Sequence, residues 1–139
     1  MHLVLHTDGG SRGNPGQAAI GVVVEIEKDG ERETLVEIAE PIGIASNNVA
    51  EYRAVIRGLE EATRLGADRV TVQLDSLLVV EQLNGRYRVK HADMLPLHRR
   101  AREAAEGIGA VTFQHVRREL NREADRLVNQ ALDGRPTSP

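Results

Sequence analysis

Apolar residues follow a two-residue period in some segments and a helical period in others, and this alternation predicts the elements of the fold. An apolar run at residues 3–8 predicts a first strand. Residues 18–42 predict two strands that turn at Asp29-Gly30, a dipeptide typical of tight hairpins. Two further strands are expected at residues 69–75 and 110–116.

Between residues 46 and 65 the period becomes helical, with Val55 and Leu59 on one apolar stripe. Ser46 or Asn47 can cap the start of this helix, because a side-chain oxygen there accepts hydrogen bonds from free backbone amides. Three more helices are expected: a short one from residue 76 to the stop at Asn84-Gly85, one at 94–109 and one at 121–132.

The resulting order of elements, β-β-β-α-β-α-α-β-α, predicts an α/β fold. The leading hairpin favours antiparallel pairing, whereas the later strand-helix-strand units favour parallel pairing. We therefore expect a mixed five-stranded sheet with helices packed on it. The length fits one domain, residues 1–133, followed by a disordered tail at residues 134–139.

The composition excludes several classes of protein. Its 40% hydrophobic and 28% charged residues are ordinary for a soluble domain, and no apolar run approaches the ~20 residues that cross a bilayer. The chain has no cysteine, so a metal would need carboxylate, carbonyl, histidine or water ligands, which favours hard cations such as Mg²⁺. The first residues do not resemble a secretory signal, and we expect a cytoplasmic monomer without membrane contact.

Positive charge gathers in residues 85–102, although the whole chain has a net charge of −3. This stretch carries six cationic side chains and one acidic one, a local charge of +5, and begins with Arg86, Arg88 and Lys90. Two interpretations are open: a surface that holds a phosphate backbone, or the solvated face of a helix. Because the chain has only three aromatic residues, we expect nucleic acid to be bound through its backbone and not by base stacking.

Two acidic residues share apolar helix faces, where a charge is costly unless it is paired. Glu51 is in line with Val55 and Leu59, and Asp125 shares a face with Val128. The alternative for Glu51 is a place at the edge of the stripe near the helix start, where the helix dipole favours acids.

Two more acids end apolar strands, Asp8 the first and Asp75 the fourth. Each has a simpler explanation: a turn aspartate before Gly-Gly for Asp8, and a helix N-cap for Asp75. Taken with Glu51 and Asp125, however, they form a set of four acids, and strand ends in α/β sheets are where sites gather. Such a cluster suits two-metal phosphodiester hydrolysis with Mg²⁺, or with Mn²⁺ as a substitute.

The segment after Asp8, GGSRGNPG at residues 9–16, is rich in glycine. Its spacing matches neither of the common nucleotide-phosphate loops, G-x-G-x-x-G and G-x-x-x-x-G-K-[ST]. We expect instead that the strand fixes Asp8 while the loop, with few side chains, leaves room for a bulky polyanion beside the main chain.

Four segments in this order resemble the motifs of type 1 ribonuclease H: TDGGSRGNPG, NNVAEYRA, LDSLLVV and NREADRLVNQA. The resemblance covers nearly the whole chain. It implies the ribonuclease H-like fold and endonucleolytic cleavage of the RNA strand of RNA/DNA hybrids, leaving 3′-hydroxyl and 5′-phosphate ends. It also implies that two Mg²⁺ ions are held by Asp8, Glu51, Asp75 and Asp125.

The same resemblance implies which residues contact the hybrid, some of them through the 2′-hydroxyl groups that distinguish RNA from DNA. They are small, amide-bearing or basic residues: Gly9, Gly10, Ser11, Asn14, Asn47, Asn48, Ser76, Arg86, Arg88 and Lys90.

The chain departs from the well-studied members of that family in two places. Many bacterial members carry a histidine in the loop before the last aspartate, whereas VRRELN at residues 116–121 has none. Arg118 in this loop resembles the arginine of a compact archaeal and actinobacterial-like subgroup, and its catalytic role would be electrostatic because arginine cannot act as a base. For His115, on the predicted strand, a structural role is favoured over a catalytic one.

The basic region is also shorter than the family's long protrusion, so we expect lower hybrid affinity that falls with salt.

Two other functions fit the same fold. A nucleic-acid-binding module that no longer cleaves would lack a metal ligand, and none is missing. A different nuclease of the superfamily, such as a junction resolvase or an exonuclease, would not need the glycine and asparagine residues that suit the minor groove of a hybrid.

Overall fold

The computed structural model describes residues 1–134 and confirms the predicted mixed sheet. Apart from Gly134, the predicted disordered tail lies outside the described residues. The strands are β1 (His2–Arg12), β2 (Gly16–Lys28), β3 (Glu31–Ala45), β4 (Arg69–Leu74) and β5 (Ala110–His115). The helices are α1 (Asn47–Arg64), α2 (Leu77–Leu83), α3 (Leu95–Ile108) and α4 (Arg122–Leu132), with a short 3-10 turn, η1 (Arg118–Leu120), before the last.

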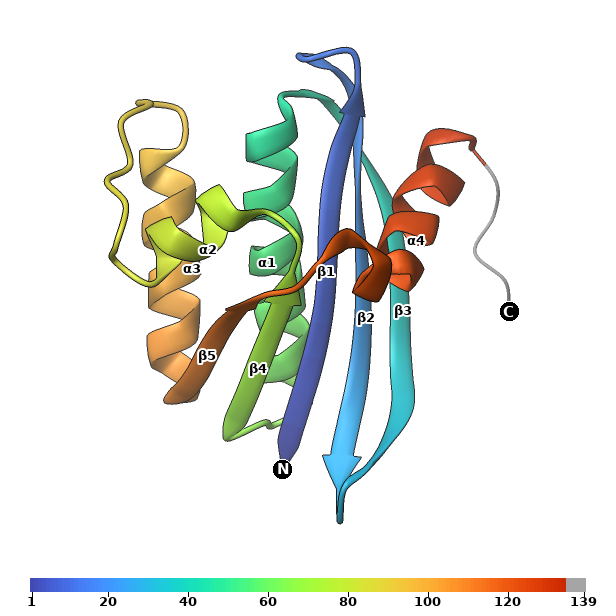
Figure 1. The fold of residues 1–139 in the computed structure, drawn as a ribbon, viewed down its shortest axis with the longest axis vertical. Helices are drawn as coiled ribbons and strands as arrows, with labels where there is room; N and C mark the ends of the chain where they lie inside the picture. The colour runs from blue at the N-terminus through green and yellow to red at the C-terminus, as the bar shows by residue number, and fades with distance from the viewer. Residues whose placement is uncertain (135–139) are drawn as a thin grey trace.

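The sheet has the strand order β3-β2-β1-β4-β5 (Figure 1). β1 pairs antiparallel with β2, and β2 with β3, whereas β1, β4 and β5 run parallel to one another. This is the arrangement that the leading hairpin and the later strand-helix-strand units predict. The turn between β2 and β3 is at Asp29-Gly30, where both residues have left-handed backbone angles, φ 55° and 80°.

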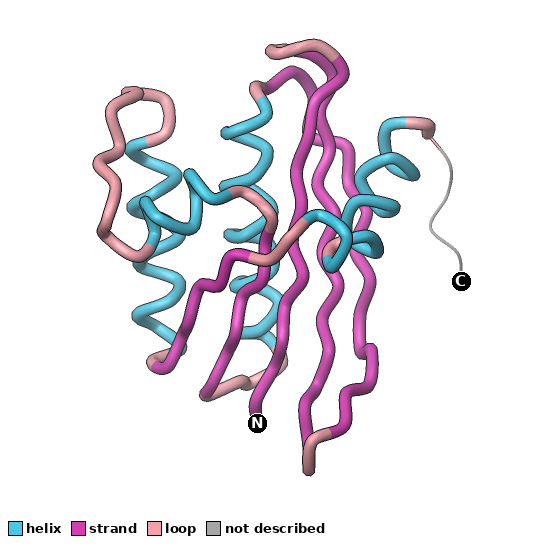
Figure 2. The backbone as a smooth tube through the Cα atoms, viewed as in Figure 1, coloured by secondary structure: helices cyan, strands magenta, loops and turns pink. Residues whose placement is uncertain are grey.

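The helices α1 and α4 cover opposite faces of the sheet, as two adjacent glycines of β1 show. A Cβ atom built on Gly9 would point into α1, whereas one on Gly10 would lie 3.7 Å from Val128 of α4. In Figure 2 the helices α1, α2 and α3 lie together, and α4 lies across the opposite side of β2 and β3. The site residues that follow therefore come from both faces.

The prediction that the first strand ends at Asp8 is wrong. β1 continues to Arg12, because its glycine-rich half pairs with β2 residue by residue, from Asp8 opposite Gly21 to Arg12 opposite Gln17. The turn is confined to residues 13–15. Asp8 therefore stands inside a continuous strand, and not at the start of a loop or turn.

The expected reason for the glycines is wrong at Gly9. A Cβ atom there would lie 2.2 Å from the backbone of Ala50, so glycine is needed for α1 to pass close to β1. Gly21 of β2 does the same for α4, since a Cβ atom there would lie 2.2 Å from the carbonyl oxygen of Ala124. The Cβ positions that these two glycines leave empty are filled by the backbones of α1 and α4.

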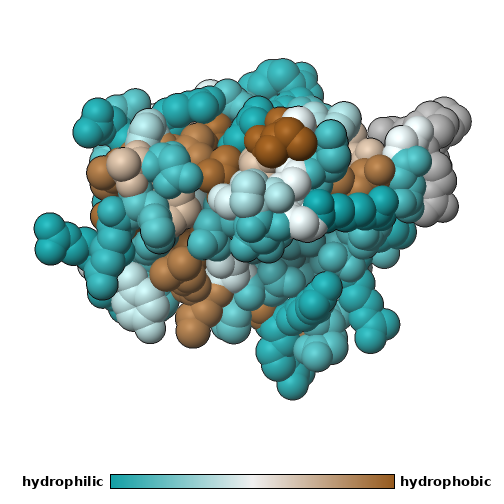
Figure 3. All heavy atoms as spheres, turned by 90° about the horizontal axis from the view of Figure 1, so that it is seen from above, coloured by the Kyte–Doolittle hydropathy of each residue, from teal (hydrophilic) through white to brown (hydrophobic). Residues whose placement is uncertain are grey.

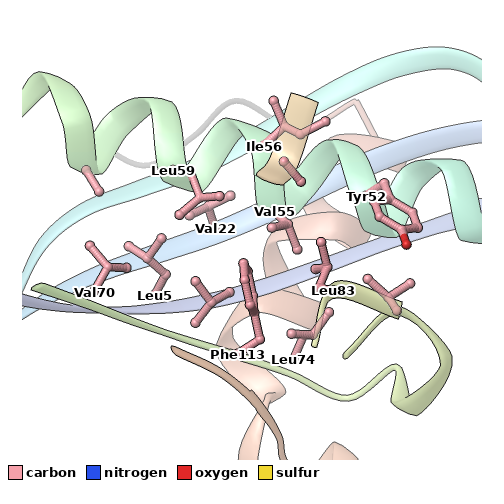
Figure 4. Close-up of a cluster of buried hydrophobic side chains, with 14 of the residues drawn as sticks. Leu5, Val22, Tyr52, Val55, Ile56, Leu59, Val70, Leu74, Leu83 and Phe113 are labelled. Carbon is pink, nitrogen blue, oxygen red and sulfur yellow. The ribbon is translucent and has the colours of Figure 1, made fainter. Parts of the chain in front are cut away.

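The main hydrophobic core lies between the sheet and α1, with α2 and α3 closing its side (Figure 4). The stripe predicted for α1 is buried here: Val55 and Leu59 contact strand residues such as Leu5 and Val22. This core fixes α1 against the strands, and with it the residues at the start of the helix. Within residues 1–134, no helix combines the length and apolarity that a membrane span requires.

Candidate active site

Three carboxylates from three separate elements meet beside the carboxyl end of β4. Asp8 comes from β1, Glu51 from the second turn of α1, and Asp75 directly follows β4. One ligand oxygen from each lies within 4.8 Å of the others. They line a cavity of about 520 Å³ together with Asp125 of α4 and Arg118 of η1. The structure thus brings together the five residues that the sequence singles out for catalysis.

Glu51 is held by the backbone of β1. The Gly9 N–H donates a 2.7 Å hydrogen bond to Glu51 Oε1, and the side chain is 7% exposed. The alternative placement at the solvent edge of the helix stripe is therefore wrong. The close approach of α1 that Gly9 permits is also what brings this carboxylate to the strand.

Burial and mutual repulsion raise the pKa values of the three carboxyl groups. The pKa of Asp8, 8% exposed, rises to about 7, first because of burial and then because of Asp75 and Asp125. Burial followed by repulsion from Asp8 and Asp75 raises the pKa of Glu51 well above its usual range, against the opposite effect of the Gly9 N–H. The pKa of Asp75 is raised by burial, and Arg118 opposes that rise.

This donor set fits a divalent cation. It consists of carboxylate oxygens, which are the ligands that Mg²⁺ and Mn²⁺ prefer. Within the described residues, none of Asp8, Glu51 and Asp75 has an ion pair with a lysine, arginine or histidine. Anionic groups that are buried together without a cation are costly unless an added ion neutralises them.

Asp125 lies outside the cluster of three but next to Asp8, whose pKa it raises both by its charge and by a side-chain hydrogen bond. It is partly exposed, it is not among the carboxylates that meet within 4.8 Å, and it raises the pKa of both Asp8 and Asp75 by its charge. It lines the cavity from α4.

Two basic residues, Arg118 and His115, lower the pKa of Asp75 by their charge. Arg118 is exposed, lines the cavity and lowers the pKa of Asp75 by its charge. His115 ends β5 and also lowers that pKa, but it does not line the cavity. Arg118 is thus the nearer candidate for contact with a phosphate.

The residues expected to contact a hybrid divide into two groups around the carboxylates. The first group lines the same cavity: Gly9, Gly10, Ser11, Asn47 and Asn48. Ser11 N–H donates to Asn47 Oδ1 at 2.9 Å, and Asn47 N–H donates to Asn14 Oδ1 at 3.1 Å. Asn14 thus holds the start of α1 to the β1–β2 turn, and it does not itself line the cavity.

The second group lies beyond Asn48, where Arg86, Arg88 and Lys90 line a neighbouring cavity of about 450 Å³ that also includes Asn48. Arg86 is paired with Glu81 at 2.6 Å, so part of its charge is used within the protein. The side chains of Arg88 and Lys90 have no ion-pair partner among residues 1–134. Seen from above, this end of the molecule is mostly hydrophilic with separate hydrophobic areas (Figure 3), which suits a polar ligand.

Ser76 has a structural role. Its hydroxyl oxygen accepts a 3.3 Å hydrogen bond from the Val79 N–H and so caps α2, and it does not line the cavity with the carboxylates. Ser76, and not Asp75, is therefore the N-cap of α2.

Other residues at the site were not expected. Arg12, Asn129 and Leu132 line the cavity with the carboxylates. Arg12 lies within the first motif, and its guanidinium is paired with Asp133 at 2.6 Å, which joins the β1–β2 turn to the end of α4. A helical repeat of four from Asp125 would have placed Asn129 and Asp133 on the same side of α4.

A family model and several solved structures match nearly the whole chain. A family model for reverse transcriptase-like proteins matches residues 6–131. The N-terminal RNase H domain of Rv2228c from Mycobacterium tuberculosis is 47% identical, with a TM-score of 0.89 over 96% of this chain and 100% of that one. RNase H1 from Halobacterium salinarum is 40% identical, with a TM-score of 0.91 over 96% of this chain and 99% of that one.

LC11-RNase H1, solved in complex with an RNA/DNA hybrid, is 40% identical, with a TM-score of 0.88 over 95% of this chain and 97% of that one. Some full-length relatives are longer than this chain. It spans 36% of the bifunctional protein Rv2228c and 62% of the ribonuclease HI of Halobacterium salinarum.

Proposed function

The chain belongs to the type 1 ribonuclease H family, and on this premise we propose that it is an endonuclease that hydrolyses the RNA strand of RNA/DNA hybrids. The observation that carries the proposal is the meeting of Asp8, Glu51 and Asp75 oxygens within 4.8 Å of one another, from three elements far apart in the chain. The hybrid bound to the similar LC11-RNase H1 supports the choice of substrate.

Two divalent ions, Mg²⁺ or Mn²⁺ in its place, would be held by Asp8, Glu51, Asp75 and Asp125. When bound, such ions lower the pKa of water to give a nucleophile and stabilise the charge on the departing oxygen. Cleavage of the bond between phosphorus and the 3′-oxygen leaves 3′-hydroxyl and 5′-phosphate ends.

The protein's own groups orient this chemistry. The Gly9 N–H fixes Oε1 of Glu51 and so holds this carboxylate beside Asp8. Arg118 supplies positive charge beside Asp75, where it would attract the scissile phosphate and stabilise its charge during cleavage.

Recognition of the hybrid falls to the polar residues on either side of the carboxylates. The side-chain oxygen Oδ1 of Asn47 accepts from the Ser11 N–H, which leaves the side-chain N–H groups of Asn47 to donate to the RNA. Asn48 lies between the two cavities, and Arg88 and Lys90 beyond it provide unpaired charge for phosphates. Because Arg86 is paired with Glu81, we expect it to contribute less than the other two.

The test compares three duplexes of equal sequence, RNA/DNA, RNA/RNA and DNA/DNA, each incubated with Mg²⁺ and with either wild type or Asp8→Asn. We expect wild type to cut the RNA of the hybrid and spare the DNA duplex, and the variant to cut neither. Binding of the hybrid without cleavage by wild type would instead support a binding module. Cleavage of branched or single-stranded DNA in preference to the hybrid would support another nuclease of the superfamily.

A further inference from the structure

Asn121, the residue before α4, is buried, and its side chain forms its hydrogen bond outside its own helix. It occupies the N-cap position of α4, yet its side chain makes no capping hydrogen bond there. The side chain is turned instead to the sheet, where Nδ2 donates a 2.9 Å hydrogen bond to the carbonyl oxygen of Thr7 in β1. Both residues are at most 1% exposed.

Asn121 forms three hydrogen bonds, each to a segment that carries a proposed site residue: Asp8, Arg118 or Asp125. Its side chain holds Thr7, the residue before Asp8. Its backbone N–H donates to the Arg118 carbonyl oxygen at 2.9 Å, and its carbonyl oxygen accepts from the Asp125 N–H at 3.1 Å. One side chain and its peptide groups therefore connect the strand of Asp8, the turn of Arg118 and the first turn that carries Asp125.

Two hydrogen-bonding possibilities of the Asn121 side chain are not used within the described part of the protein. An asparagine at an N-cap normally stabilises its helix by accepting from a free amide, and here that bond is not made. In addition, Asn121 Oδ1 is buried and accepts no hydrogen bond among residues 1–134. The Asn121 side chain is thus used to bind the strand and not to cap its own helix, which indicates a role in placing α4 on the sheet.

The approach of α4 to β2 is limited at Gly21, where a Cβ atom would lie 2.2 Å from the Ala124 carbonyl oxygen. That contact sets how closely the helix lies against the sheet. The bond from Asn121 to Thr7 fixes its position along β1, one helical turn before Asp125 and one residue before Asp8.

We propose that Asn121 is a positioning residue that sets the separation between the Asp8 and Asp125 carboxylates and thereby the affinity of the site for divalent cations. The proposal rests on the proposed function of those carboxylates as metal ligands. Groups that orient metal ligands without touching the metal commonly contribute about 10- to 100-fold in affinity or activity.

The first variant is Asn121→Ser, because serine is a good N-cap for α4 and its hydroxyl is too short to take the place of the amide at Thr7. Asn121→Ala is the second, without any cap. The matched control is Asn84→Ala, which removes the same kind of bond, from Asn84 Nδ2 to the Phe113 carbonyl oxygen at 3.2 Å, away from the carboxylates. Mg²⁺ affinity is measured by isothermal titration calorimetry without nucleic acid, and thermal unfolding is measured in parallel.

We expect Asn121→Ser to weaken Mg²⁺ binding by about tenfold while it remains folded, and to need more Mg²⁺ for half-maximal cleavage of a hybrid. Asn84→Ala should keep the wild-type Mg²⁺ affinity even if its Tm falls. Wild-type Mg²⁺ affinity in both Asn121 variants would overturn the positioning role, whatever their Tm. If wild type itself neither bound Mg²⁺ nor cleaved the hybrid, the proposed function would fall, and the assignment of Asn121 with it.

Discussion

Two glutamates of α1, ten residues apart, are similarly buried, but their pKa values are shifted in opposite directions. Glu51 is 7% exposed and Glu61 is 5% exposed. Glu61 accepts hydrogen bonds from Arg57 and Arg64 at 3.1 and 3.0 Å, and these arginines hold its pKa below the usual range. Glu51 lies beside Asp8 and Asp75, and its pKa is raised by burial and by their charges.

The contrast teaches that burial of a carboxylate does not by itself mark a functional site. At the end of α1 the protein supplies its own cations, so Glu61 is neutralised within the fold. At the start of α1 the protein supplies a backbone N–H from Gly9 and further acids instead. The first arrangement is neutralised within the protein, whereas the second would gain stability from a bound divalent cation.

The largest effect that separates the two regions is expected for Glu51→Gln. Glutamine keeps the oxygen that accepts from Gly9 but removes the charge, so the fold is kept and a metal ligand is lost. We expect cleavage of an RNA/DNA hybrid to fall by at least about 10³-fold. Thermal unfolding without metal should show a higher Tm than wild type, because repulsion is relieved. Wild-type cleavage rates in this variant would remove Glu51 from the site.

A smaller effect is expected for Arg118→Ala, which removes a cation beside the carboxylates. The side chain is exposed, so Tm should stay at the wild-type value. We expect kcat for the hybrid to fall about 10- to 100-fold through the loss of charge beside the scissile phosphate. The control is Arg117→Ala, the preceding exposed arginine, which does not line the cavity. Equal rates for the two variants would contradict a role for Arg118.

The hydrophobic pattern predicted the sheet and the helices, and it located the acids that break the pattern. Glu51 could be found because a charge in line with Val55 and Leu59 is anomalous on an amphipathic helix. The hairpin at Asp29-Gly30 could be found because turns with left-handed residues have a local chemical signature.

What the sequence could not predict depends on contacts between distant segments. The second half of β1 has no apolar alternation, and only its pairing with β2 makes it a strand. Gly9 serves the approach of Ala50, forty-one positions along the chain, which no local pattern records. The pairing of Arg86 with Glu81 and the turn of Asn121 toward Thr7 are likewise visible only once the helices are in place.

Mg²⁺ should stabilise the protein, and by more at pH 8 than at pH 5. The carboxyl of Asp8 has a pKa near 3.8 when unfolded and about 7 when folded, so the folded protein keeps a proton that the unfolded chain loses. Stability without metal is therefore lost as the pH rises through 7, when the buried acids ionise. Mg²⁺ offsets that loss, by about 2.7 kcal/mol at a hundredfold excess over Kd.

The measurement is Tm against pH, with EDTA and with Mg²⁺, for wild type and Glu51→Gln. The Tm of Glu51→Gln should depend less on pH and on Mg²⁺ than the Tm of wild type. A rise in Tm with Mg²⁺ that is as large at pH 5 as at pH 8 would place the bound ion away from these carboxylates.

The smallest effect is expected at the other end of α1. Glu61→Gln removes two ion pairs and leaves weaker hydrogen bonds, and we expect the free energy of unfolding to fall by about 1 kcal/mol. Its pKa is lowered in the folded protein, so wild type should lose this contribution as the pH falls below the usual range of a glutamate. Chemical denaturation measures the change, and cleavage of the hybrid should be unaffected. A loss of kcat in Glu61→Gln would mean that the two ends of α1 are not independent.

The most direct test of the central claim is anomalous diffraction from crystals of the wild-type protein soaked in Mn²⁺. Asp8, Glu51, Asp75 and Asp125 should surround the strongest anomalous peaks, and Glu51→Gln crystals treated in the same way should lose one or both. Mn²⁺ peaks elsewhere on the surface, with none between these carboxylates at millimolar Mn²⁺, would contradict the account.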